Sequence, residues 1–563
     1  MRNKDFSPEK KDRIKIARSI FEGIIVITVL TLIIKTLFTF SVYKPYSSSD
    51  ISKESNDVKN GFIAVSYFGV DRTGDETLIS TEALEKQIKA LKDNGYVTIT
   101  QQDILDYYKN GKTLPDKALF LLFEDGRRDT AIFSQKILEQ YNYKATMLTY
   151  ADKFEKNDPK FLMPKDLLNL KDSSFWELGT NGYRLEYINV FDRYSNFLGR
   201  LDSVEFSKAA PRIKRDYNHY LMDYIRDENG IPIETREEMN KRINSDYDAL
   251  TKIYNDELGY VPQLYVLMHS NTGKFGTNDK VSEVNGKWIK DLFSINFNRE
   301  GYSLNLPNSS IYDLTRIQPQ AYWSTNHLLM RIWDDTKKDT QFVIGDADKA
   351  RDFQQIRGQA EFVDDKIILT SLPKEKGLIK LSNREPIKDV KISTMLNGNI
   401  IGSQSIYLRS NEDTSNSLCI QLVNNVVNVI ENSNGTKTNL YSLDLGDKNK
   451  EEYDIKESGS KKVDITLIDN KLTLTIDDKK VVEDLKVSNE NKGDIFLESA
   501  WGNYGYSQRN IADDVYDGIF ENFKVTSINN EVLYDSSLKG LEAIKYNVKN
   551  SFNKLVNWFI KNL

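Results

Sequence analysis

Apolar and polar positions in the first half of the chain follow two alternating patterns. The strand-like run at 61–70 predicts a strand, and the continuous apolar run within 117–126 predicts a buried strand. Between them, residues 80–96 carry apolar side chains three and four positions apart, which predicts an amphipathic helix that ends near a glycine. Strands that alternate with helices favour a parallel sheet or a (β/α) barrel, which we expect over residues 61–330.

Residues 190–260 are charged and lack long apolar runs, and we expect them to be mostly helical. The clearest helix covers 235–259. Thr235 and Glu238 have the spacing of a capping box at its start, and Gly259 follows its last apolar position.

The pattern changes after about residue 335. Short apolar or alternating segments follow one another, and Asn, Asp, Gly and Lys separate them without intervening helices. This rhythm predicts an all-β, jelly-roll-like sandwich over residues 335–530. Within it, "LIDNKLTLTIDDKKV" (467–481) predicts two consecutive hairpins.

The N-terminal segments suggest a membrane anchor. Residues 1–18 are basic, residues 19–43 are mostly apolar, and residues 44–60 are polar and serine-rich like a linker. The basic cluster predicts a cytoplasmic N-terminus and an extracellular bulk in a single-pass membrane protein. A cleaved signal peptide is the alternative.

The C-terminal segment, residues 536–563, predicts a basic amphipathic helix. Its apolar side chains recur at helical spacing, at Leu541, Ile544, Val548, Phe552, Leu555, Phe559 and Leu563. This stripe either packs against the protein's own domains or faces a membrane surface or a partner.

Composition narrows the possible partners. The 563-residue chain has a net charge of −6, so it lacks the broad basic surface of a nucleic-acid-binding protein. Its one cysteine, Cys419, excludes an intrachain disulfide.

Candidate chemistry begins where the apolar run "ALFLLF" ends in Glu124-Asp125-Gly126. In parallel α/β folds, catalytic side chains lie at the carboxyl ends of strands. We therefore expect both carboxylates at such a rim. For Asp125 and Asp129 the alternative is a structural role, in which they cap the next helix or pair with Arg127 or Arg128.

Residues 80–150 resemble the polysaccharide deacetylase family, which shares the NodB homology domain. The resemblance lies in the order of helix, "NGY", strand, helix, "LP", strand and acidic tip. It implies a distorted (β/α)7-type barrel that acts on an N-acetylated sugar polymer. It also implies that Glu124 stands at the position of the general base and Asp125 at that of a metal ligand.

The resemblance fails at the expected metal site. Asn181 stands where the first histidine ligand is expected, and Leu185 where the second is expected. Zn²⁺ prefers nitrogen and sulfur ligands, so we expect no metal cofactor. Binding of another divalent cation through Asp125 is the alternative. His269 follows a late strand and is either a catalytic acid or a structural strand-end histidine.

Several further residues are candidates for substrate binding. In the barrel they are Asn181, Glu177 and Arg128. The β-rich region resembles concanavalin-like (LamG-type) sandwiches, in which Trp501 and Tyr504 could bind a glycan; the alternative is an aromatic packing cluster.

Together these features predict a deacetylase-like protein that acts on or binds a cell-surface polysaccharide or exopolysaccharide, with an altered or lost metal site. A non-catalytic glycan-binding scaffold of an exopolysaccharide assembly is one alternative. A metal-independent glycoside hydrolase that uses rim carboxylates is another. The expected partners are an N-acetylated polysaccharide, the membrane through residues 19–43, and exopolysaccharide synthesis machinery.

Overall fold

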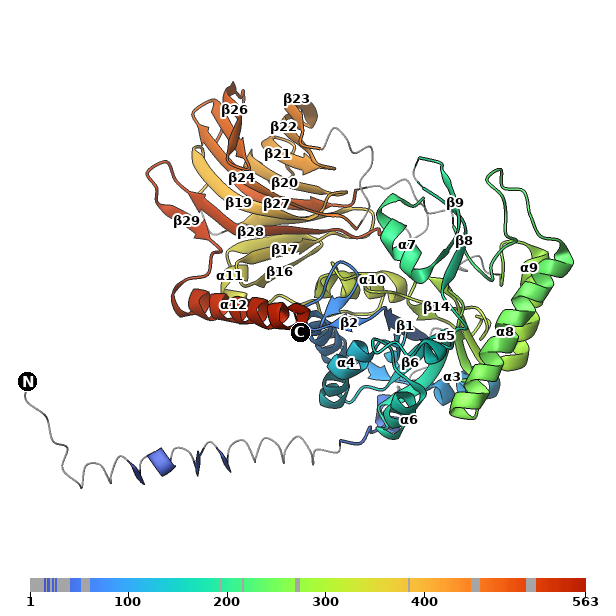
Figure 1. The fold of residues 1–563 in the computed structure, drawn as a ribbon. Helices are drawn as coiled ribbons and strands as arrows, with labels where there is room; N and C mark the ends of the chain where they lie inside the picture. Colours follow the sequence, from blue (N-terminus) through green and yellow to red (C-terminus); the bar gives the residue numbers. More distant parts are fainter. Residues whose placement is uncertain are drawn as a thin grey trace, which may run out of the picture. The chain divides into compact units, whose positions relative to one another are not determined.

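The computed structural model describes residues 15–16, 18–20, 23–24, 26–27, 41–51, 61–192, 194–214, 217–268, 274–382, 385–446, 456–502 and 513–562. The chain divides into two compact units, residues 1–44 and 45–563. The second unit contains all the elements described below (Figure 1).

Seven parallel strands form a barrel-like sheet in the first part of this unit. Their order around the barrel is β1 (Phe62–Tyr67), β5 (Ala118–Phe123), β6 (Ala145–Tyr150), β7 (Trp176–Gly182), β11 (Leu264–Val266), β12 (Ile295–Glu300) and β14 (Leu314–Arg316). A parallel bridge between Val65 and Ile317 joins the last strand to the first. The expected barrel over the first half of the chain is therefore present, and the carboxyl ends of all seven strands meet at one rim.

Every residue of β5 is buried, as its continuous apolar run predicts.

Short strands and helices complete the barrel. The two expected helices are α2 (Thr81–Asp93), capped by Ser80, and α8 (Arg236–Leu258), which begins with the Thr235 capping box. The other elements are β2 (Val70–Asp71), β3 (Ile79–Ser80), β4 (Val97–Thr98), β13 (Leu304–Asn305), α3 (Gln101–Asn110), α4 (Arg128–Tyr141), α5 (Asp152–Lys156), α6 (Pro164–Asp172), α9 (Asp279–Leu292) and α10 (Thr325–Thr336).

The expectation that residues 190–260 are mostly helical is wrong for their first half. An antiparallel sheet is inserted there, with β8 (Glu186–Phe191) between β9 (Phe197–Asp202) and β10 (Asn218–His219), and with the short helices α7 (Ser203–Ala209) and η2 (Ala210–Arg212). Aromatic stacking explains part of this fold. Tyr187 stacks on Phe206 with ring centroids 3.9 Å apart, an arrangement that charge content does not reveal.

Two antiparallel sheets follow the barrel. One contains β15 (Phe353–Arg357), β18 (Lys376–Leu381), β20 (Ser403–Ser410), β21 (Ser417–Val423), β22 (Val426–Ser433), β23 (Thr436–Asp444) and β27 (Asp494–Ala500). The other, which we call the outer sheet, contains β16 (Gln359–Val363), β17 (Lys366–Thr370), β19 (Val390–Asn399), β24 (Ser458–Ile468), β25 (Lys471–Ile476), β26 (Lys479–Lys486), β28 (Asp517–Thr526) and β29 (Val532–Asp535).

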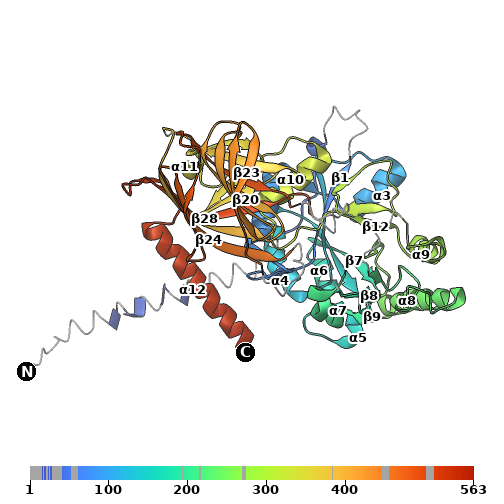
Figure 2. The ribbon, with the colours of Figure 1, turned by 90° about the horizontal axis from the view of Figure 1, so that it is seen from above.

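Inner side chains of both sheets form one apolar core, which includes Ile406 and Val429 from the first sheet and Leu396 and Phe520 from the second. This arrangement is an all-β sandwich (Figure 2). The two predicted hairpins are present as β24–β25–β26.

A buried ionic cluster joins the barrel to the sandwich. In α10, His327 places Nδ1 3.1 Å from a carboxylate oxygen of Asp517 and Nε2 3.0 Å from one of Asp513. Arg331 also binds Asp513, at 2.6 Å. Burial acts to lower the pKa of His327, but the two carboxylates outweigh it and raise that pKa to about 9.

The predicted C-terminal helix is α12 (Gly540–Asn562). Its polar side contacts the barrel, where Lys549 binds Glu82 at 2.7 Å and Arg72 donates to Asn553 at 2.9 Å. Its apolar stripe is exposed; Val548 and Phe552, for example, are 63% and 60% accessible. The expectation that this stripe packs against the protein's own domains is therefore not met.

The single-pass membrane localisation is corrected by the structure. Across the described residues, no helix combines the length and the apolar character needed to cross a membrane. Most of the apolar stretch 19–43 lies outside the described residues.

Candidate functional site at the barrel rim

Glu124 is held rigidly at the carboxyl end of β5. The residue is fully buried. Its Oε1 accepts hydrogen bonds from Ser66 Oγ at 2.6 Å, Arg316 Nε at 3.0 Å and Gln318 Nε2 at 3.0 Å. Its Oε2 is buried and has no hydrogen-bond partner. One carboxylate oxygen thus accepts three hydrogen bonds, while the other is buried without a hydrogen-bond partner.

Arg316 is a site residue that the sequence analysis missed. It is completely buried at the end of β14 and also pairs with Glu300, at 3.2 Å. Burial acts to lower the pKa of Arg316, but the negative charges of Glu124 and Glu300 outweigh it and raise that pKa above its usual value. Arg316 is 192 positions from Glu124, and only closure of the barrel brings the two together. The sequence shows Arg316 only as a basic residue in the three-residue strand Leu-Thr-Arg.

Asp125 turns the chain away from the strand. Its φ of 65° lies in the left-handed region, which Asp tolerates better than most residues. Gly126 follows at φ 63°, where a Cβ would lie 2.6 Å from Thr149 Cγ2. Burial of its carboxyl group, aided by the neighbouring charge of Glu124, raises the pKa of Asp125 to about 7. Asp125 can therefore exchange a proton near neutral pH.

Asn181 and Tyr150 complete a group that we call the rim cluster, together with Glu124 and Asp125. Asn181 Oδ1 accepts from the backbone N–H of Asp125 at 3.2 Å, whereas the buried Nδ2 has no hydrogen-bond partner. Tyr150 ends β6, and its buried hydroxyl also has no hydrogen-bond partner. Burial and then the charge of Asp125 keep the pKa of Tyr150 well above its usual value, so the hydroxyl stays protonated.

Other candidates from the sequence lie elsewhere. Glu177 is at the opposite end of β7, where it accepts from the backbone N–H of Gln101 at the start of α3. Arg128 binds Asp166 of α6 at 3.0 Å. Asp129 pairs with Arg127 at 3.2 Å, as its structural alternative requires. The structure therefore does not bring Glu177 to the rim.

Trp501 does not belong to the rim cluster. Trp501 donates from Nε1 to the backbone carbonyl of Asp513 at 2.6 Å, within the sandwich. His269 and Tyr504 lie outside the described residues.

At the two positions where the resemblance expects histidine ligands, the structure shows Asn181 and Leu185. Asn181 Oδ1 is already bonded to a backbone N–H, and its free atom is a nitrogen donor of hydrogen bonds rather than a metal ligand. Leu185 packs against the apolar core of the barrel. Over the part of the chain that the structure describes, no group of three or more His, Cys, Asp or Glu side chains could hold a metal ion.

Comparison with known proteins gives partial matches. The poly-β-1,6-N-acetyl-D-glucosamine N-deacetylase of Escherichia coli (strain K12) is 33% identical to this chain over 110 residues. The match covers 19% of this chain and 16% of that enzyme. No family model matches the chain.

Two solved structures of deacetylases are similar to about half of the chain. A de-N-acetylase from Aggregatibacter actinomycetemcomitans is 18% identical, with a TM-score of 0.37, and the match covers 47% of this chain and 97% of the enzyme. The BpsB deacetylase domain from Bordetella bronchiseptica is 15% identical, with a TM-score of 0.35 and the same two coverages.

Proposed function

We propose that this protein is a deacetylase-like protein that binds an N-acetylated polysaccharide at the rim cluster, without the zinc ion of the resembling family. The observation that carries the proposal is the pair of unsatisfied buried atoms, an acceptor at Glu124 Oε2 and a donor at Asn181 Nδ2. Each such atom costs about 1–3 kcal/mol until a ligand pairs with it.

An acetamido group complements this pair. Its N–H can donate to Glu124 Oε2, and its carbonyl oxygen can accept from Asn181 Nδ2. The hydroxyl of Tyr150 offers a second donor at the same rim. The substrate named for the curated relative, poly-β-1,6-N-acetyl-D-glucosamine, carries one such group on every sugar. We therefore propose this polymer class as the ligand.

Metal-independent hydrolysis is a second candidate function. Glu124 is ion-paired with Arg316, whereas the pKa of the adjacent Asp125 is raised to about 7. Two neighbouring carboxyl groups with different environments can divide the roles of acid and base between them. Asp125 would hold the exchangeable proton, and Glu124, ion-paired with Arg316, would be the second carboxyl group.

A binding assay with matched variants tests the proposed function. Asn181→Leu removes the free donor, and we expect it to weaken binding of a β-1,6-linked N-acetylglucosamine oligomer at least tenfold. Glu124→Gln replaces the free acceptor and should act in the same direction. Glu177→Gln, the same change at the opposite end of the barrel, is the control and should leave affinity unchanged. Equal affinity in all four proteins would contradict the proposal.

A further inference from the structure

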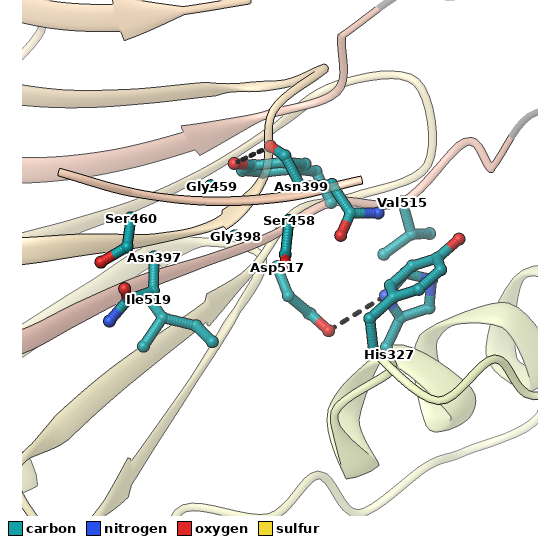
Figure 3. A pocket seen from close by; sticks show the side chains of 12 residues that line it. His327, Asn397, Gly398, Asn399, Ser458, Gly459, Ser460, Val515, Asp517 and Ile519 are labelled. Carbon is teal, nitrogen blue, oxygen red and sulfur yellow. Dashed lines mark hydrogen bonds and ion pairs between the residues drawn. The ribbon is translucent and has the colours of Figure 1, made fainter. Parts of the chain in front are cut away.

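A pocket of about 370 Å³ lies between α10 and the outer sheet, away from the rim cluster (Figure 3). Its volume falls within the range of small-ligand sites, roughly 300–1,000 Å³. Tyr322 and His327 line it from the barrel side, and the ends of β19, β24 and β28 line it from the sandwich side. The three strands are neighbours in the outer sheet.

Strand alternation explains which side chains face this pocket. Leu396 and Phe520 are paired across β19 and β28 and point into the sandwich core. The next pair, Asn397 and Ile519, therefore points to the opposite face. Asn397 also pairs with Ser460 of β24, so an apolar, an amide and a hydroxyl side chain form one row, visible on one wall in Figure 3.

Small residues keep the pocket open. Gly398 is paired with Gly459, and Ser458 and Ser460 on either side of Gly459 have short, exposed side chains. By the alternation described above, Gly398 faces the side opposite to Asn397, where a Cβ would lie 2.6 Å from Tyr516 Oη. The hollow is thus encoded by the sequence of these strands.

The charged residues of the pocket neutralise one another. Asp517 accepts from Ser324 N at 2.9 Å and from Thr370 Oγ1 at 2.6 Å, and it is ion-paired with His327. His327 in turn contacts Asp513 on its other ring nitrogen. Because these charges are paired, the pocket favours a neutral polar ligand over an ion.

We propose that this pocket is a second glycan-binding site, which takes one or two neutral sugar residues. The hydroxyl groups of Ser458 and Ser460 would bind sugar hydroxyls together with the amide oxygen of Asn397, whose nitrogen donates to Glu521 at 2.8 Å. Ile519 would pack against an apolar C–H face. The inference rests on the proposed function in one respect, since it assigns the same N-acetylated polymer to both sites. One polymer chain that occupies both sites gains affinity through effective concentration.

Calorimetric titration of the full chain with a β-1,6-linked N-acetylglucosamine dimer tests this inference. The dimer is a short probe for single sites, so we expect two molecules bound per wild-type chain. Ser460→Trp fills the pocket from an exposed strand position and should reduce this number to one. Ser433→Trp, on an exposed position of β22 in the other sheet, is the matched control and should retain two.

A milder variant guards against misfolding of Ser460→Trp. The double change Ser458→Ala and Ser460→Ala removes only two hydroxyl groups and should weaken the pocket site at least fivefold at an unchanged melting temperature. If Asn181→Leu loses one dimer while the pocket variants behave as wild type, the pocket inference is overturned and the rim proposal stands. If only the pocket variants lose a dimer, the rim proposal is overturned. If wild type binds no dimer, both are overturned.

Discussion

Asp125 occupies a strained and partly buried position at the end of β5. Its backbone is left-handed, and its N–H is held by Asn181. Burial disfavours the charged carboxylate, so ionisation of this group opposes folding. Such a cost is expected where a chain keeps a reactive group in place for binding or catalysis.

Because the pKa of Asp125 is raised, replacing this carboxyl group should increase the free energy of unfolding at high pH but not at low pH. The pKa is about 7 in the folded chain and 3.8 as the ordinary value, so stability falls as pH rises from about 4 to about 7. Asp125→Asn should therefore raise the free energy of unfolding at pH 8 by on the order of 2 kcal/mol, with little effect at pH 4. Urea unfolding at both pH values measures this. Asp129→Asn is the control. If Asp125→Asn raised the free energy of unfolding equally at pH 4 and pH 8, the raised pKa of Asp125 would be contradicted.

The sequence predicted only part of the rim cluster. Glu124 and Asp125 could be placed because an apolar strand leads directly into them, and Asn181 because the resemblance aligned it with a missing histidine. Tyr150 of this cluster, and Arg316, which binds Glu124, could not be placed, because their proximity to Glu124 depends on closure of the whole barrel. The left-handed turn at Asp125 likewise depends on the close contact between Gly126 and Thr149.

At the scale of elements, α10 connects the barrel to the sandwich through charged groups rather than apolar contacts alone. His327 and Arg331 face Asp513, Asp514 and Asp517, and the ring of Trp323 stacks on His327 with centroids 4.4 Å apart. Removal of one member of a buried ion cluster leaves its partners unpaired and is destabilising.

This cluster predicts a loss of stability in alkaline solution. The folded pKa of His327 is raised to about 9 from an ordinary 6.5, so its contribution is complete below about pH 6.5 and disappears as pH rises through 9. Wild type should lose on the order of 2 kcal/mol of unfolding free energy between these values. His327→Gln should be less stable at pH 6 and should show little change across the same range. A parallel pH profile for both proteins would refute this role.

The C-terminal helix should be dispensable for folding. The contacts of α12 described above are a partly exposed ion pair and a hydrogen bond, and its apolar side chains face outward. Deletion of residues 538–563 should change the free energy of unfolding by about 1 kcal/mol or less, because exposed ion pairs contribute little. Thermal unfolding of both proteins tests this, and a loss of several kcal/mol would show that the apolar stripe is buried in the folded chain.

At the scale of the whole molecule, the pattern of apolar residues was sufficient to predict a barrel followed by an all-β region. This pattern did not predict the inserted sheet at 186–219. The strands there lack a clear alternation of apolar and polar residues, and stacked aromatic side chains help to hold them. The membrane anchor was inferred from an apolar stretch and the basic residues before it, whereas among the described residues no helix is long and apolar enough to cross a membrane. The domain boundaries at 330 and 335 remain predictions.

The central claim is that the rim cluster recognises an acetamido group without a metal ion. Titration of the chelator-treated protein with matched β-1,6-linked oligomers, one N-acetylated and one with free amines, tests it most directly. The claim predicts at least tenfold tighter binding of the N-acetylated oligomer, unchanged when zinc is added back. Equal binding of the two oligomers, or binding that requires stoichiometric zinc, would contradict it.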